Sequence, residues 1–169
     1  MTINTERLTL RPLELRDLMS THAYASDTES TRYMVFLPNE SVGETEQFIR
    51  EATEELAKET PSYYEFAVLM KGTHIGGIGL YRLEDGSAEL GWILNRSFWG
   101  HGYAGEAARG VMAWARMRLD IRRFIAQCDA ENDASRRVME RLGMRLVSSA
   151  GGRKNRSSEE ERTELSGST

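Results

Sequence analysis

The sequence predicts an α+β fold, also described as α/β, with a mixed, mostly antiparallel twisted sheet of about six strands and flanking helices. Two features predict it: consecutive antiparallel strands in the middle of the chain, and a strand–helix–strand crossover after them. In the middle, short turns separate apolar runs, and the dipeptide Asp85-Gly86 is a strong hairpin signal. These runs span residues 64–70, 75–83 and 88–94.

The crossover begins where the last of these runs leads through a glycine-rich turn into a helical run, residues 104–119. A further strand-like run, residues 121–129, follows the helix. Because a strand–helix–strand connection usually returns in the same direction, we expect the two flanking strands to be parallel neighbours.

The first sixty residues predict one strand and a set of helices. Residues 6–13 alternate charged and apolar side chains, as a half-buried strand does, and residues 14–33 predict one or two short helices. Ser41 and Glu44 fit a capping box at the start of an amphipathic helix that ends before Pro61.

The C-terminal part predicts a second helix at 132–142 and a short strand at 144–147. Beyond it, residues 148–169 are mostly Ser, Gly, Glu and Arg, with Leu165 as the only large apolar side chain. Such a segment buries too little surface to offset its ordering entropy. We therefore expect one folded domain at 1–147 and a flexible polar tail without a strand at 148–169.

Composition excludes several classes of protein. A chain of 169 residues suffices for one domain, and its formal net charge of −4 provides no basic field for nucleic acid. No apolar run approaches the ~20 residues of a membrane span, and the N-terminus does not resemble a signal peptide. Cys128, the only cysteine, is interpreted as a small buried hydrophobe. We expect a cytoplasmic protein without nucleic-acid, membrane or metal partners.

The glycine-rich turn is the strongest functional signal. It reads Trp99-Gly100-His101-Gly102-Tyr103-Ala104-Gly105 and lies between a predicted strand and a predicted helix. Few Cβ atoms separate its backbone from a ligand, and the first N–H groups of the helix have no partners inside the helix. Together with the helix dipole, these groups favour a phosphate or pyrophosphate. The turn lacks the Lys-Ser or Lys-Thr of a P-loop and does not open the chain as a dinucleotide fingerprint does.

Two motifs resemble those of the GNAT acyl-CoA transferases. The pattern W-G-x-G-Y-A-x-E-A, starting at Trp99, is similar to the pyrophosphate loop of the branch that contains the ribosomal-protein N-acetyltransferases. The stretch from Asp129 to Met144 resembles the family pattern D-x-x-N-x-x-S-x-x-v-x-x-K-L-G-F, with Arg141 in the Lys position. The resemblance covers roughly residues 5–147. The alternative is a glycine-rich strand–helix turn that binds nothing.

The resemblance implies a role for each candidate residue. Asn132 would contact the pantetheine arm of CoA, Ser135 would return a proton to the leaving thiolate, and Arg141 would lie near the phosphates. The alternative roles are a helix cap for Asn132, a packing position for Ser135 and a solvated charge for Arg141. Backbone N–H groups on one strand would hold the thioester carbonyl, near Trp92, Ile93 and Leu94. The pyrophosphate loop would comprise Gly100, His101, Gly102, Tyr103, Ala104 and Gly105.

The acceptor amine must lose a proton before it attacks. An α-amino group with a pKa of about 8 is roughly one-tenth neutral at pH 7, so a weak base suffices. Glu89 is the best candidate for that base, because it precedes the expected thioester site on the same strand; the alternative is a cross-strand surface charge. His22 and Tyr24 are candidate substrate contacts, although packing roles are the simpler interpretation.

The resemblance favours an N-acetyltransferase that uses acetyl-CoA as co-substrate and needs no metal. The amine would attack directly in a ternary complex, and the acceptor would be a protein or peptide N-terminus. Two alternatives stay open: a small-molecule amine or antibiotic as acceptor, and a non-catalytic CoA-binding domain. The second alternative arises because the family normally adds a final strand that residues 148–169 do not predict. A missing strand would leave a sheet edge able to pair in a homodimer.

Overall fold

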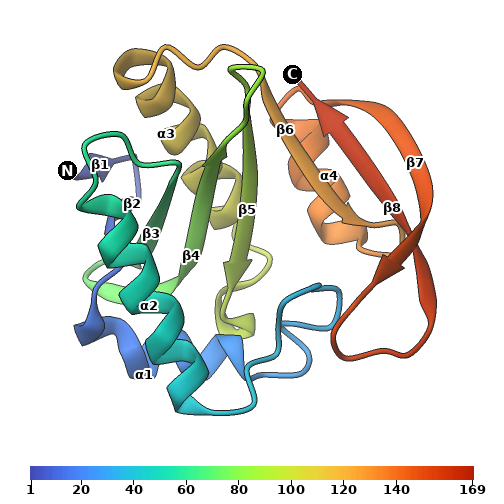
Figure 1. The fold of residues 1–169 in the computed structure, drawn as a ribbon, viewed down its shortest axis with the longest axis horizontal. Helices are drawn as coiled ribbons and strands as arrows, with labels where there is room; N and C mark the ends of the chain where they lie inside the picture. Colours follow the sequence, from blue (N-terminus) through green and yellow to red (C-terminus); the bar gives the residue numbers. More distant parts are fainter.

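One sheet of eight strands runs through the computed structural model, which describes residues 1–169 (Figure 1). The strands lie side by side in the order β1-β2-β3-β4-β5-β6-β8-β7. Every neighbouring pair is antiparallel except β5 and β6, which are parallel. The strands are β1 (Ile3–Asn4), β2 (Leu8–Pro12), β3 (Tyr63–Met70), β4 (Thr73–Arg82), β5 (Ala88–Leu94), β6 (Phe124–Asp129), β7 (Arg145–Lys154) and β8 (Glu161–Ser168).

The α+β class and the mixed, mostly antiparallel sheet are thereby confirmed, with eight strands in place of about six. The two additional strands are the two-residue β1 and the last strand, β8. Both lack a clear apolar alternation of their own, and each forms because a neighbouring strand offers it backbone hydrogen-bond partners.

Four helices cover the sheet, two on each face (Figure 1). On one face Ala67 of β3 packs with Ile49 of α2. On the other face the aromatic rings of Tyr64 and Phe66 lie edge-on to Trp114 of α3, at centroid distances of 5.1 and 5.5 Å. None of the helices combines the length and apolarity required to cross a bilayer. The helices are α1 (Leu18–Ala25), α2 (Val42–Leu56), α3 (Tyr103–Arg118) and α4 (Asp133–Arg141); 3₁₀ turns occur at Leu15–Asp17 and Arg96–Phe98.

The main core lies between the sheet and α3. Small side chains on the inner face of α3 let the helix approach the strands closely, and Ala107, Ala108 and Ala115 are almost fully buried. Cys128 is buried in the same core, as predicted for a small hydrophobe, and burial raises the pKa of its thiol. This packing holds the start of α3 in a fixed position relative to β5.

The prediction of a flexible tail without a strand at residues 148–169 was wrong. β7 continues to Lys154, and β8 then inserts between β6 and β7. The sheet edge on this side is therefore β7. A homodimer that forms through an exposed sheet edge stays a prediction, and β7 is the strand that would pair. Apolar patterning could not reveal β8, because buried polar contacts to distant residues hold it in place.

The centre of these contacts is the Asp129 carboxylate at the end of β6. It accepts hydrogen bonds from Arg162 Nε of β8 (3.1 Å), from Asn155 Nδ2 (2.7 Å) and from the backbone N–H of Glu131 (2.9 Å). Burial by itself raises the pKa of Asp129, but these hydrogen bonds outweigh it and hold the pKa below the ordinary value. A second ion pair, Arg153 to Glu164 at 2.7 Å, joins β7 to β8.

We expect Asp129→Ala to lower the free energy of unfolding by about 2–4 kcal/mol, because Arg162 and Asn155 would lose their shared acceptor in a buried position. Urea unfolding at pH 7 measures the loss. The wild-type contribution is complete above the ordinary aspartate pKa and disappears as the pH falls through the lowered pKa, so the difference should shrink in acid. Glu59→Gln is the control, because that carboxylate is exposed and makes no ion pair. Equal stability of Asp129→Ala and wild type would contradict this account of β8.

Candidate functional site

Strands β5 and β6 pair over only two residues and then separate (Figure 1). The pairs are Ala88 with Phe124 and Glu89 with Ile125. Beyond Glu89, β5 continues for five more residues without a partner on that side, although β4 pairs with it on the other side as far as Leu94. The divergence leaves part of the β5 backbone unpaired within the sheet.

The direction of each β5 amide follows from its neighbours. The N–H of Ala88 donates to Arg123 O on the β6 side at 3.1 Å, whereas the N–H of Asn95 donates to Ile75 O, next to β4, at 2.9 Å. Because N–H groups alternate along a strand, those of Trp92 and Leu94 point toward the β6 side, beyond the last pair.

Ile93 differs from its two neighbours. Its carbonyl oxygen faces β4 so closely that a Cβ on Gly76 would lie 2.3 Å away, so its N–H also points toward β4. The N–H groups of Trp92 and Leu94 therefore point into the gap between β5 and β6, whereas that of Ile93 points toward β4. On the gap side, the Leu94 carbonyl accepts a hydrogen bond from Trp99 Nε1 at 2.9 Å.

The glycine-rich turn follows directly and leads into α3. Gly100 and Gly102 both have φ of +78°, a left-handed conformation that side-chain-bearing residues avoid. Gly102 is the N-cap of α3 and offers no side chain to bind the first helical amides. None of the six N–H groups from Gly100 to Gly105 donates to an acceptor within the protein. The turn thus presents a row of unpaired amides at the positive end of a sixteen-residue helix.

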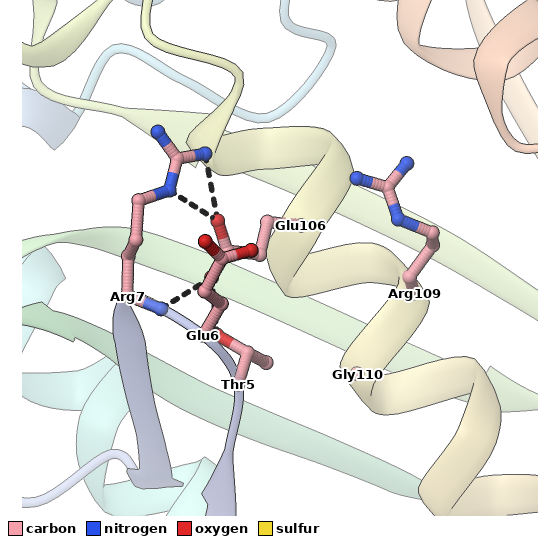
Figure 2. Close-up of a pocket in the computed structure, with 6 residues that line it drawn as sticks. All are labelled: Thr5, Glu6, Arg7, Glu106, Arg109 and Gly110. Carbon is pink, nitrogen blue, oxygen red and sulfur yellow. Dashed lines mark hydrogen bonds and ion pairs between the residues drawn. The ribbon is translucent and has the colours of Figure 1, made fainter.

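A buried carboxylate holds this turn against the start of the chain (Figure 2). Glu106 accepts hydrogen bonds from Thr5 Oγ1 (2.6 Å), Arg7 N (2.8 Å) and Arg7 Nε (2.7 Å). Arg7 also donates to the His101 carbonyl at 3.0 Å, and its guanidinium lies 4.7 Å over the Tyr103 ring. His101 and Tyr103 stack on each other, so their side chains contribute packing, and the free N–H groups of the turn are what remains for a ligand.

Arg109 is a candidate that the sequence analysis did not single out. Its Nη1 lies 3.7 Å from the position that a Cβ on Gly105 would occupy, and no acidic side chain pairs with it. Figure 2 shows Arg109 lining the same pocket as Arg7, whose charge Glu106 already balances. The available signal was its spacing, because residues four apart on a helix are neighbours, here Gly105 and Arg109.

The second candidate helix, α4, starts at the same edge of the sheet. Because β5 and β6 are parallel, their carboxyl ends meet at one edge, and α3 and α4 begin there. Asn132 caps α4, its Oδ1 accepting from Ser135 N at 3.1 Å. Ser135 is half-buried, and its hydroxyl makes no hydrogen bond within the protein. Arg141 is exposed in the last turn, about 13 Å along the axis from Asn132, so the structure does not bring it to this edge.

Glu89 lies on the opposite face of the sheet, on the side of α1 and α2. It is half-buried, and burial raises the pKa of its carboxyl, as does the nearby Glu164, while Arg153 opposes them. The cross-strand surface charge is therefore too simple an interpretation, because an acid in this position is partly desolvated and faces another acid.

The two other acceptor-side candidates are tied into the packing of α1. His22 Nδ1 lies 2.8 Å from Thr45 Oγ1 of α2, and Tyr24 is 4% exposed, with its ring edge-on to His74. The structure groups no three His, Cys, Asp or Glu side chains in an arrangement that could hold a metal ion.

Comparison with known proteins identifies relatives of this architecture. A family model described as "Acetyltransferase (GNAT) domain" matches residues 7–145. An uncharacterized N-acetyltransferase named p20, from Bacillus licheniformis, is 34% identical over 145 residues, which cover 83% of this chain and 80% of the relative.

Solved structures share the fold over nearly the whole chain. One is an acetyl transferase from Salmonella typhimurium described as modifying the N-terminal serine of the ribosomal protein L7/L12; it has a TM-score of 0.88 and 17% identity, and the match covers 100% of this chain and 98% of that one. Another is RimL, a ribosomal L7/L12 α-N-protein acetyltransferase, in complex with coenzyme A, with a TM-score of 0.84, 19% identity and coverage of 98% and 97%.

Anion binding by the unpaired amides can be tested without knowing the natural ligand. We expect inorganic pyrophosphate to shift the ¹⁵N–¹H resonances of Gly100 to Gly105, because these amides are free and lie at a helix N-terminus. The amides that open α2 are the internal control, since the Ser41 hydroxyl already accepts from Glu44 N. Equal shifts at both helices would show that the glycine-rich turn has no special affinity for the anion.

Proposed function

Because this chain belongs to the GNAT acetyltransferase family, we propose that it transfers the acetyl group of acetyl-CoA to a primary amine. The observation that carries the proposal is the row of six unpaired amides, Gly100 to Gly105, beside the point where β5 and β6 separate. A diphosphate fits this row, since it offers several anionic acceptors to amides that have none.

Different residues at this edge bind different parts of acetyl-CoA. The amides of the glycine-rich turn hold the pyrophosphate, and Arg109 adds a positive charge beside Gly105. Asn132 contacts the pantetheine arm from the start of α4, and the N–H groups of Trp92 and Leu94 receive the thioester carbonyl. The backbone donors then stabilise the negative charge that develops on the carbonyl oxygen, an effect often worth about 3–4 kcal/mol.

The transfer proceeds by direct attack. The neutral amine forms a C–N bond to the acetyl carbon, and the C–S bond to CoA breaks. Ser135 donates its hydroxyl proton to the departing thiolate and regains one from the nitrogen, which loses a proton as it becomes an amide. This role suits its half-buried hydroxyl without a protein partner. Holding both reactants in one complex adds to the rate gain, because it removes the entropy cost of their encounter.

We propose a protein or peptide N-terminus as the acceptor. The Salmonella neighbour is described as acting on an N-terminal serine, and an α-amino group needs only a weak base at neutral pH. Glu89, partly desolvated beside Glu164, attracts the ammonium form to the face of the sheet opposite α3. A small-molecule amine or antibiotic would be attracted in the same way and is the second candidate. The non-catalytic alternative rested on a missing last strand, and β8 removes that ground.

Acetyl-CoA at 100 times its Kd should stabilise the folded protein by about 2.7 kcal/mol, because it binds only the folded state. Thermal unfolding with and without acetyl-CoA measures this.

Gly102→Ala should weaken the binding of acetyl-CoA about tenfold, since Ala disfavours the left-handed conformation on which the turn depends. Gly43→Ala in the first turn of α2 is the matched control, with no positive φ and no close neighbour. A wild type that acetyl-CoA does not stabilise would refute the proposed function.

Ser135→Ala should lower kcat by roughly 10²-fold and leave the Kd of acetyl-CoA unchanged, because the hydroxyl acts only when the thiolate leaves. Thiol release with an amine panel that includes N-terminal serine peptides measures kcat, and calorimetry measures Kd. Ser148→Ala on the exposed strand β7 is the control. Full activity of Ser135→Ala would leave Ser135 as a packing residue of α4.

A further inference from the structure

A second carboxylate lies on the same face of the sheet as Glu89, the face on the side of α1 and α2. Glu65 of β3 is half-buried on the side of α1 and α2, and the Tyr81 hydroxyl of β4 donates a hydrogen bond to its Oε1. That is the only hydrogen bond of either side chain, and no lysine or arginine pairs with Glu65. A carboxylate without a cation is costly to keep at a partly buried position.

Two glycines make room for this pair. A Cβ on Gly79 would lie 2.7 Å from the Tyr81 hydroxyl and 2.8 Å from Glu65 Oε1, closer than real Cβ contacts allow. A Cβ on Gly91 of β5 would lie 4.0 Å from the Tyr81 ring. Tyr63 stacks on Tyr81 with centroids 5.7 Å apart and fixes the ring. The Glu65 carboxylate therefore lies over β4, one strand spacing of about 5 Å from β5.

The level of the pair along the sheet is also significant. Glu65 pairs with Gly79, and Gly79 pairs with Gly91, one residue before Trp92. At about 3.3 Å per residue, Glu65 is level with a point about 3 Å from Trp92 along β5, whereas Glu89 is about 10 Å away. In the proposed complex, Glu65 is thus closer in level to the thioester carbonyl.

The surroundings suit a proton acceptor. Burial raises the pKa of Glu65 to about 7, and the hydrogen bond from Tyr81 opposes this rise. The other titratable groups that face the pair are Tyr63 on its own strand, Tyr24 from α1 and Glu89 across from Tyr81 on β5, and none is a cation. A base with a pKa near the working pH is the most effective one.

We propose that Glu65, held by Tyr81, takes the proton from the ammonium group of the acceptor; this rests on the proposed function. One N–H bond of the ammonium breaks, its electron pair stays on nitrogen, and the proton passes to a Glu65 carboxylate oxygen. The neutral amine then attacks the acetyl carbon, and the C–S bond breaks. The thiolate receives its proton from Ser135, and the second proton that the nitrogen releases as it becomes an amide returns to the Ser135 oxygen. Glu89 attracts the charged acceptor, and Glu65 makes it reactive.

A structural role and a catalytic role predict opposite effects on stability. The folded-state pKa of Glu65 lies above its unfolded value, so ionising it costs stability as the pH rises from the ordinary glutamate pKa through about 7. Glu65→Gln removes that cost and should raise the melting temperature at pH 8 but not at pH 4, while it impairs turnover. A pair that served only to hold the sheet together would lower the melting temperature when changed.

The experiment compares wild type, Glu65→Gln, Tyr81→Phe and Glu89→Gln, with Glu59→Gln on the surface as control. The probe is the peptide amide Ser-Ala-Ala-Ala with a free N-terminus, assayed by thiol release from pH 6 to 9. Glu65→Gln should lose at least 10²-fold in kcat and the pH dependence near 7, with the acetyl-CoA Kd unchanged. Tyr81→Phe should shift that pH dependence, and Glu89→Gln should mainly raise the KM for the peptide.

A ¹³C titration of the glutamate carboxyls in the absence of any substrate decides the matter independently. Glu65, assigned by its absence in Glu65→Gln, should titrate near pH 7; titration near the ordinary value would overturn the proposal, as would full activity of Glu65→Gln. A lower melting temperature of both Glu65→Gln and Tyr81→Phe at pH 8 would also overturn it. Failure of the proposed function is distinguishable, because acetyl-CoA would then not stabilise the wild type.

Discussion

The short parallel pairing of β5 with β6 is the constraint on which the rest of this structure depends. Two residue pairs join the strands, and the remaining backbone of β5 is then free on one side. Parallel direction brings both carboxyl ends to one edge, so α3 and α4 must begin there. Free strand amides and free helix amides therefore meet at one edge, which is the arrangement that an acyl-CoA requires.

Most of the binding surface at this edge is main chain, and side chains serve to hold it in place. Glu106 and Arg7 join the start of α3 to the N-terminal strands, and Tyr103 and His101 stack beside them. A backbone site of this kind is costly, because Gly100 and Gly102 lose more conformational freedom on folding than other residues would. The buried carboxylate of Glu106 offsets part of that cost through its several hydrogen bonds.

The two faces of the sheet have different chemistry. The face covered by α3 and α4 contains the apolar core and the proposed CoA site, whereas the opposite face presents Glu65, Glu89 and Glu164 around β4, β5 and β8. Partly desolvated acids destabilise a fold when they ionise, and their presence on the face that the proposed acceptor would meet fits recognition of an ammonium group. The fold tolerates them because the core on the other face stabilises the sheet independently.

Local patterns in the sequence determined the three central strands, the helices after them and the glycine-rich turn at residues 100–105, because hydrophobic period, caps and glycine conformation act over a few neighbouring residues. Only the tertiary structure decided the strand β8 and the contact of Glu65 with Tyr81. It also decided that the N–H of Trp92 points into the gap between β5 and β6, whereas that of Ile93 points toward β4. Asp129 and Arg162 are 33 residues apart, and Glu65 and Tyr81 are 16 apart. Such contacts depend on strand register and on burial, and neither quantity is encoded in any short stretch of the chain.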